Sequence, residues 1–212
     1  NSGDDCDDCF GVPNGSSALD DCGVCDGGNA DDLGCGCFEA GPSGCDETCG
    51  STAVEDDCGV CDGDGTSCLA SLSLGSFDAS GSLEVLYDFG GPVAGFQFDV
   101  SGLALAGGSG GAAGDAGFDV QTGGGTVLGF SFAGGTVEAG SGVLTVLSFT
   151  GVTAGTTELT LGNFGAVTGS DGSVFDVTTS GSIDHGDQDC AGTYYGDSWI
   201  SDCGCVAKGN SG

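Results

Sequence analysis

The placement of cysteine is the feature that most constrains how this chain folds. Fourteen of its 212 residues are cysteine, and they lie in two blocks, eleven in the first 68 residues and three near the C-terminus. So many cysteines in a short chain are typical of an oxidising compartment and a disulfide framework, whose connectivity the sequence alone leaves open. We therefore expect an extracellular protein with three segments: cysteine-rich modules over 1–68, a cysteine-free domain over 69–188 and a truncated module over 189–212. All fourteen cysteines are predicted to form disulfides: Cys6, Cys9, Cys22, Cys25, Cys35, Cys37, Cys45, Cys49, Cys58, Cys61, Cys68, Cys190, Cys203 and Cys205.

The cysteine-free segment has the pattern of β-strands. Apolar and polar residues alternate with a period of two, and Gly, Ser, Asp and Pro separate the runs, which is the signal for an antiparallel sheet. We find no window with a helical period. The segment is long enough to bury a core of its own, and short strands at this spacing predict an all-β sandwich or jelly roll. The predicted strands contain Leu83–Phe89, Phe96–Val100, Phe118–Val120, Leu128–Phe132, Val143–Phe149, Leu159–Leu161 and Val174–Phe175.

A thirteen-residue spacing between cysteines recurs in the two cysteine blocks. It separates Cys9 from Cys22, Cys45 from Cys58 and, in the third copy, the residues at 190 and 203. Aspartate precedes and glycine follows the second cysteine each time, which indicates one small module used three times. Both blocks hold an odd number of cysteines. If all are paired, at least one disulfide joins the blocks, within a chain or between the tail of one chain and the head of the next.

Two resemblances follow from these motifs. Residues 5–68 and 189–205 resemble the Asp/Cys-rich repeats of large secreted proteins, and the segment from Asp56 to Cys68 carries the repeat almost letter for letter. The central segment resembles a cohesin-type domain through Val93–Asp99, Gly142–Phe149 and Asp171–Val177. The second resemblance implies a jelly-roll β-sandwich flanked by small disulfide-rich modules. It also implies a role in extracellular adhesion or assembly, in some members through calcium-loaded dockerin modules.

Aspartates around the two Cys-x-x-Cys pairs make calcium the strongest candidate cofactor. Hard oxygen ligands on glycine-rich turns suit Ca²⁺, although the spacing is not that of an EF-hand. Turn formation and solubility are the alternative roles for these residues, and halophilic adaptation is a further explanation of the acidity. Zinc and redox activity are disfavoured for the Cys-x-x-Cys pairs, because disulfides suit the cysteine count and the acidic surroundings oppose a low thiol pKa. The candidate ligands are Asp20, Asp21, Asp26, Asp56, Asp57, Asp62 and Asp64.

Three further features point to the cell exterior or to an interface. Asn14-Gly15-Ser16 is a glycosylation sequon in a turn, so we expect an exposed glycan acceptor. Tyr194, Tyr195 and Trp199 cluster in the truncated module. Such aromatic residues anchor an interface, stack on a glycan or fill a small core, and we place them at an interface. The single histidine, His185, has no nucleophile motif beside it, so we expect an exposed turn residue and no enzyme.

Charge excludes several partners. The chain has 32 acidic residues and one basic residue, Lys208, for a formal net charge of −31, so nucleic acid is excluded as a partner. No apolar run is long enough to span a membrane. The leading functional hypothesis is an extracellular structural subunit that assembles head to tail into a filament, sheath or coat through its terminal modules. The alternative is a monomeric cohesin-like adhesion module that captures a dockerin-type or glycan partner, and a secreted hydrolase ranks third.

Overall fold

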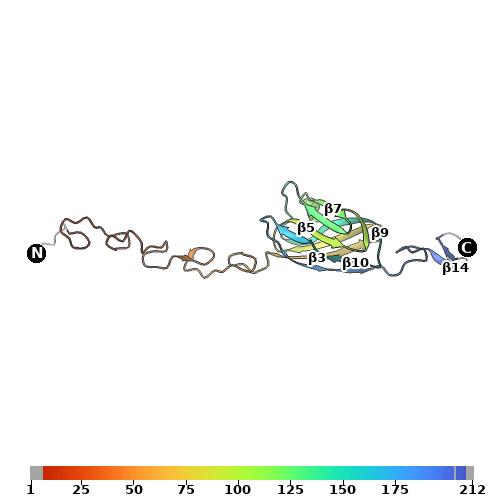
Figure 1. Ribbon diagram of the computed structural model, residues 1–212, viewed down its shortest axis with the longest axis horizontal. Coiled ribbons are helices and arrows are strands. Elements are labelled where there is room, and N and C mark those ends of the chain that lie inside the picture. Colours follow the sequence, from red (N-terminus) through yellow and green to blue (C-terminus); the bar gives the residue numbers. More distant parts are fainter. Residues whose placement is uncertain (1–6, 203, 209–212) are drawn as a thin grey trace. The chain divides into compact units, whose positions relative to one another are not determined.

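The chain is nearly all β-structure and consists of two compact units. The computed structural model describes residues 7–202 and 204–208 (Figure 1). One unit ends at Gly65 and the other starts at Thr66. The second unit contains the sandwich and also the described part of the C-terminal cysteine-rich segment.

The second unit is built around two β-sheets packed face to face (Figure 1). One is a 6-stranded sheet in the order β13-β10-β5-β8-β7, with β11 also paired to β5. The other is a 5-stranded sheet in the order β12-β3-β4-β9-β6. The strands are β3 (Leu69–Asp78), β4 (Ser82–Phe89), β5 (Val93–Val100), β6 (Leu103–Ser109), β7 (Asp119–Gly123), β8 (Thr126–Phe130), β9 (Gly140–Val152), β10 (Thr156–Thr160), β11 (Ala166–Gly169), β12 (Asp176–Ser180) and β13 (Ser182–Asp184).

The core lies between the sheets and follows from the alternating pattern of the strands. In β4 and β5, every second residue points inward, so Leu83, Val85, Phe96 and Phe98 are almost fully buried. Leu144 and Leu147 of the interior strand β9 belong to the same core cluster. A fully buried aliphatic or aromatic side chain stabilises a fold by about 1.5–3 kcal/mol, so this core holds the domain without cross-links.

The chain passes from one sheet to the other through a turn that requires glycine. Strand β12 pairs with β3 in parallel, and β13 pairs with β10 of the opposite sheet. Gly181 lies between them with φ +113, and a Cβ there would come within 2.9 Å of the Leu74 Cβ. The chain therefore changes sheets at one edge of the sandwich, where β12 and β13 are the edge strands of the two sheets.

Three details differ from the sequence analysis. A five-residue helix, α1 (Gly111–Asp115), lies in a glycine-rich segment where no helix was expected, and its residue Ala113 packs into the core. Val174, predicted to be in a strand, precedes β12 and is 66% exposed, whereas its neighbour Phe175 is buried in the core. The apolar residues of the predicted strand Leu128–Phe132 do not point inward: Val127 and Gly129 face the core and Leu128 faces outward.

The cysteine-rich segments contain little regular structure and no extended core. Their strands are the pairs β1 (Pro42–Ser43) with β2 (Thr48–Cys49), and β14 (Trp199–Ser201) with β15 (Gly204–Val206). Large apolar residues such as Phe10, Leu33 and Phe38 are more than half exposed. Disulfides and local hydrogen bonds must therefore stabilise these loops.

This division predicts that the sandwich folds independently of the redox state. Under reducing conditions the β-sheet circular dichroism signal of residues 69–188 is expected to persist, and Leu144→Ala is expected to lower its free energy of unfolding by about 2–5 kcal/mol through the cavity it leaves. Val174→Ala, at an exposed site, is the matched control and should have little effect. Loss of the sheet signal on reduction alone would contradict the independent core.

Candidate functional site

An eight-residue loop built around one aspartate occurs four times in the described chain. In each copy the first residue is aspartate, and its Oδ1 accepts hydrogen bonds of 2.8–3.0 Å from the backbone N–H groups of the third and fifth residues. In three copies Oδ2 also accepts the N–H nine residues further on. We call these segments the aspartate loops: Asp8–Gly15, Asp20–Gly27, Asp56–Gly63 and Asp189–Gly196.

Glycine positions in the aspartate loops explain much of the repeated sequence. The fourth residue is always glycine with φ between +75 and +80, a left-handed conformation that favours glycine. The eighth is also glycine, because a Cβ there would collide with Oδ2 of the loop's own aspartate. The sequence analysis identified the repeat, but it assigned Asp20 and Asp56 to a metal site. It gave Asp8 and Asp189 no role.

These hydrogen bonds also set the charge of the aspartates. The N–H of Val24 holds the pKa of the Asp20 carboxyl below its ordinary value, and the N–H of Val60 does the same for Asp56. In the C-terminal copy, the N–H of Thr193 lowers the pKa of Asp189. A lowered pKa in the folded state means that the ionised carboxylate stabilises the loop above the unfolded pKa of about 3.9 and that this stabilisation is lost as the pH falls through the lowered value.

The predicted calcium ligands are not gathered into one site. Asp20 and Asp56 each already accept three backbone N–H groups, and Asp26 accepts the Ser17 hydroxyl at 2.7 Å. Asp21 accepts the amide of Asn29. Within the described residues, no three of the seven predicted carboxylates bring oxygens within 4.8 Å of one another. Their arrangement offers calcium no multidentate cage, so binding by these residues, including the exposed Asp57, Asp62 and Asp64, stays a prediction.

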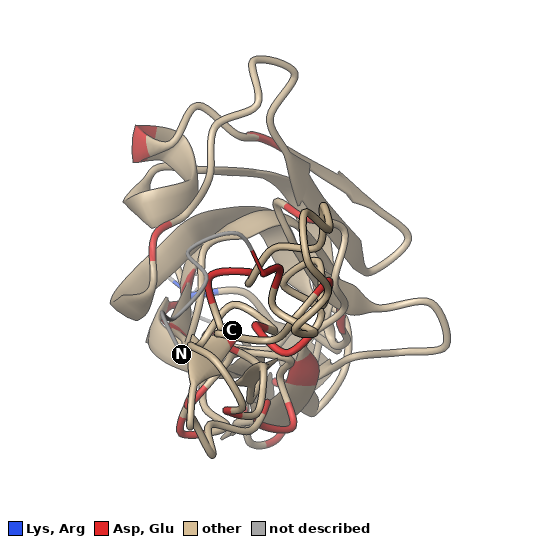
Figure 2. Cartoon of the chain, turned by 90° about the vertical axis from the view of Figure 1, so that its left-hand side faces the viewer, with Lys and Arg blue, Asp and Glu red and all other residues tan. Residues whose placement is uncertain are grey.

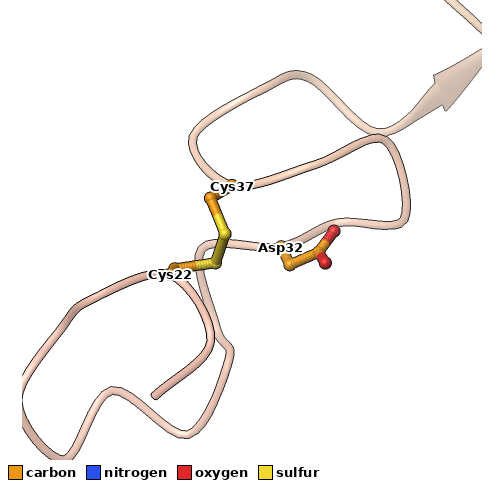
Figure 3. A group of neighbouring side chains, drawn as sticks. All are labelled: Cys22, Asp32 and Cys37. Carbon is orange, nitrogen blue, oxygen red and sulfur yellow. A yellow bond between two sulfur atoms is a disulfide. The ribbon is translucent and has the colours of Figure 1, made fainter. Parts of the chain in front are cut away.

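One group of metal-ligating residue types does come together, at Cys22, Asp32 and Cys37 (Figure 3). The two sulfur atoms are bonded to each other at 2.06 Å. The Asp32 carboxylate points away from them and accepts the N–H of Gly34 at 2.9 Å. A disulfide has no free thiolate to ligate a metal, so this group is a cross-link beside a turn.

The disulfides of the N-terminal unit overlap along the chain. Each bond closes 14 to 16 residues, and each begins before the previous one ends. The pairs are Cys9–Cys25, Cys22–Cys37, Cys35–Cys49 and Cys45–Cys61, with Cys190–Cys205 near the C-terminus. Cys58 and Cys68 are also disulfide-bonded. Cys6 and Cys203 lie outside the described residues, so the predicted bond between the blocks stays a prediction.

The remaining predicted residues lie in or beside aspartate loops. Asn14 is exposed in the seventh position of the first loop, with φ 53, and its glycosylation stays a prediction. Trp199 and Ile200 are 49% and 76% exposed, so they do not fill a core. Tyr194 and Tyr195 instead contact His185 through their rings.

The expectation of an exposed histidine was wrong. His185 is 6% exposed, since Phe77 lies 5.0 Å from it between ring centroids and Tyr195 covers it. The hydroxyl of Thr157 lies 2.8 Å from its Nε2 and that of Tyr195 lies 2.7 Å from its Nδ1. A sequence pattern gives no sign of this burial, because the partners lie 10 to 108 positions away, in a loop and in strands β3 and β10.

The outer face of the 6-stranded sheet carries an exposed apolar surface. Residues opposite each other on neighbouring strands point to the same face, so the strand register places two rows there. Leu128 and Phe130 of β8 lie in the middle of the rows, beside Gln97 and Gly95 of β5. The rows are Gln121–Leu128–Gln97–Ala166 and Asp119–Phe130–Gly95–Thr168.

Two exposed aromatic residues lie next to these rows. Phe132 is 85% exposed, and its ring meets that of Phe130 edge-on at 4.7 Å. Phe164 is 86% exposed, and its carbonyl accepts the Gln97 amide at 3.2 Å, which holds its backbone at the same face. Gly95, Leu128, Phe130 and Ala166 line a groove of about 320 Å³ on this face. We call this surface, with Leu128, Phe130, Phe132 and Phe164, the aromatic face.

Acidic residues are distributed along the chain (Figure 2), and two of them lie at the apolar surface. Asp119 ends one row, and Asp99 lies on the same side of β5 with its carboxylate bound to the Thr126 hydroxyl at 2.7 Å. The single lysine, Lys208, pairs with Asp197 at 2.9 Å. A second groove of about 370 Å³, on the 5-stranded sheet, has Asp88 and Asp176 but no aromatic residue in its lining. No helix within 7–202 and 204–208 is long and apolar enough to cross a membrane.

Comparison with known proteins gives structural similarity only. No family model matches the chain, and no curated protein matches it. A chain of the crystallised CaDoc0917–CaCohA2 complex aligns with 19% identity and a TM-score of 0.42, covering 54% of this chain and 98% of its own. A non-cellulosomal cohesin from the archaeon Archaeoglobus fulgidus gives 19% and 0.40, over 55% and 90%. The sixth cohesin of Acetivibrio cellulolyticus scaffoldin B, solved with a Cel5 dockerin mutant, gives 16% and 0.42, over 55% and 98%.

The aspartate loops lead to a test of one carboxylate against its neighbour. Asp56→Ala removes the acceptor of three backbone N–H groups, whereas Asp57→Ala removes an exposed carboxylate from the next position. Peptide mapping after oxidative refolding is expected to show less of the Cys45–Cys61 bond in the first variant than in the second. Equal yields from the two variants would show that the loop does not need its aspartate.

Proposed function

We propose that this chain is an extracellular, non-catalytic binding module that captures a protein partner on the aromatic face. The observation that carries the proposal is that two aromatic residues at this face are more than four-fifths exposed: Phe132, whose ring contacts Phe130, and Phe164, whose backbone is held by Gln97. Soluble proteins rarely leave several large apolar side chains together on one face without using them. Aromatic side chains at the centre of a patch with a polar rim are typical of binding hot spots.

The surroundings of the aromatic face define the chemistry of the partner. Gly95 and the groove leave room for an inserted apolar side chain, and Asp99 and Asp119 favour Lys or Arg at the rim. A chain with a net charge of −31 repels acidic partners at long range. We therefore infer a partner with an apolar centre and a basic rim. The cohesin resemblance of the sequence makes a dockerin-type module the first partner to test.

An extracellular location suits the cross-linked loops. The disulfides within the first 61 residues need an oxidising compartment, and the loops they close have no apolar core to replace them. Head-to-tail assembly into a filament, the other function predicted from the sequence, stays a prediction. A binding module gives discrete particles, whereas a subunit of a filament gives polymers, so light scattering distinguishes the two.

A photo-crosslinker in the aromatic face tests the proposal. The chain carrying p-benzoylphenylalanine at position 132 is irradiated with the secreted proteins of the source organism in a buffer that contains calcium. One major cross-linked partner is expected, with the apolar centre and basic rim inferred above. Position 200, 76% exposed on the C-terminal hairpin, is the control site. The partner is then purified and titrated against Phe132→Ser, whose affinity is expected to fall at least about tenfold, as for loss of a hot-spot side chain.

Three outcomes would overturn the proposal. Cross-linking no stronger at position 132 than at 200 would remove the aromatic face as the binding surface. Cross-links only to other copies of the chain would favour self-assembly. Equal affinity of the Phe132→Ser and Ile200→Ser variants would separate binding from the aromatic face.

A further inference from the structure

The C-terminal aspartate loop contacts the sandwich through a cluster of aromatic side chains. Tyr195 donates to or accepts from Nδ1 of His185 at 2.7 Å, and its ring lies 5.9 Å from that of Phe77 in β3. Phe77 in turn stacks on Phe149 of β9 at 5.4 Å, so the cluster continues into the core. The Cys190–Cys205 bond joins the same loop to the β14–β15 hairpin.

The identity of Tyr195 is not explained by the loop itself. It occupies the seventh position, which has φ between +51 and +58 in all four copies and is held by Asn14, Asp26 and Asp62 in the others. Asn and Asp tolerate this left-handed conformation, whereas a bulky aromatic residue rarely adopts it. The loop keeps the same hydrogen bonds, so the contact with the sandwich accounts for the tyrosine.

The neutral form of His185 uses one hydroxyl partner as a donor and the other as an acceptor. A neutral imidazole has one donor and one acceptor nitrogen, and it pairs with one hydroxyl that accepts and one that donates. The imidazolium has two donors, so the hydroxyl that donated to the ring loses its acceptor. Thr157 is completely buried, so a bond that its hydroxyl gives up is not replaced from solvent, and the cation would lie against Phe77.

The groups around the ring favour the neutral form. Phe77 faces it from β3, Thr157 from β10, and Tyr194 and Tyr195 from the loop. Asp184, the preceding residue of β13, is the one charged group that acts on it. Burial lowers the pKa of His185, and the charge of Asp184 opposes this only in part.

We propose that Tyr195, His185 and Thr157 form a latch that docks the C-terminal loop on the sandwich and opens when His185 binds a proton. The pKa of His185 is lower when the loop is docked than when it is released. Docking is therefore strongest above the ordinary histidine pKa of about 6.5 and weakens as the pH falls below that value. The segment 189–208 is then held above neutral pH and mobile in acid. This would change the orientation of the exposed Trp199 and Ile200 without unfolding the sandwich.

The chain contains one tryptophan and one histidine, which makes the test direct. Fluorescence anisotropy decay of Trp199 reports motion of the C-terminal hairpin, and the NMR shift of the His185 ring proton reports protonation. In the wild type, the slow component of the anisotropy is expected to be lost with the same midpoint as the histidine titration. Circular dichroism over this pH range should stay constant.

Matched variants separate the latch from general acid effects. Tyr195→Phe removes the hydroxyl that bonds His185, so this variant should lose the slow component already at pH 7.5. Tyr194 also contacts His185 through its ring, and Tyr194→Phe keeps that ring, so this variant should behave as the wild type. His185→Gln keeps a polar side chain but does not titrate, so its pH step should vanish. A wild-type step that persists in His185→Gln, or identical decays for the two tyrosine variants, would overturn the proposal.

Discussion

The hydrogen bond from a backbone N–H to an aspartate carboxylate is the interaction on which the cysteine-rich segments depend. These segments have no apolar core, and their loops turn back on themselves through carboxylates such as Asp20 and Asp56, each of which accepts three such bonds. Charge-assisted bonds of this kind are stronger than bonds between neutral groups. An acidic chain with one lysine therefore satisfies part of its negative charge with its own backbone.

The same loop serves different purposes through its seventh position. Asp26 uses that position to bond Ser17 and Ala18 within its own module. Tyr195 uses it to contact His185 and Phe77 of the sandwich. The backbone of the loop stays the same, while the residue at the seventh position differs in what it contacts.

In the sandwich, the two faces of β8 differ in burial. Val127 and Gly129 face the core, and a side chain at Gly129 would collide with the ring of Phe96. The larger residues Leu128 and Phe130 lie on the outer face, where they add nothing to the core. Together with Phe132 and Phe164 they form the surface to which we assign the partner.

The fold could be predicted from the sequence where one side of a strand is buried. The strands around Leu83–Phe89 and Phe96–Val100 lie where the alternation placed them, because burial of one face imposes a period of two. The alternation from Leu128 to Phe132 has the same period, but its apolar residues point away from the core. A period of two does not reveal whether the apolar face of a strand is buried or exposed. The burial of His185 and the roles of Asp8 and Asp189 depend on three-dimensional contacts and on backbone conformation, which residue spacing does not reveal.

Hydrogen exchange of three backbone amides tests the central claim, that hydrogen bonds from backbone N–H groups to aspartate carboxylates hold these loops. The amides of Val24, Val60 and Thr193 donate to the aspartates of three loops. If the account is correct, they are protected from exchange in the oxidised chain in the presence of a calcium chelator, and added calcium changes little. If they exchange freely in the chelator and become protected only when calcium returns, the carboxylates serve the cation and the account is contradicted.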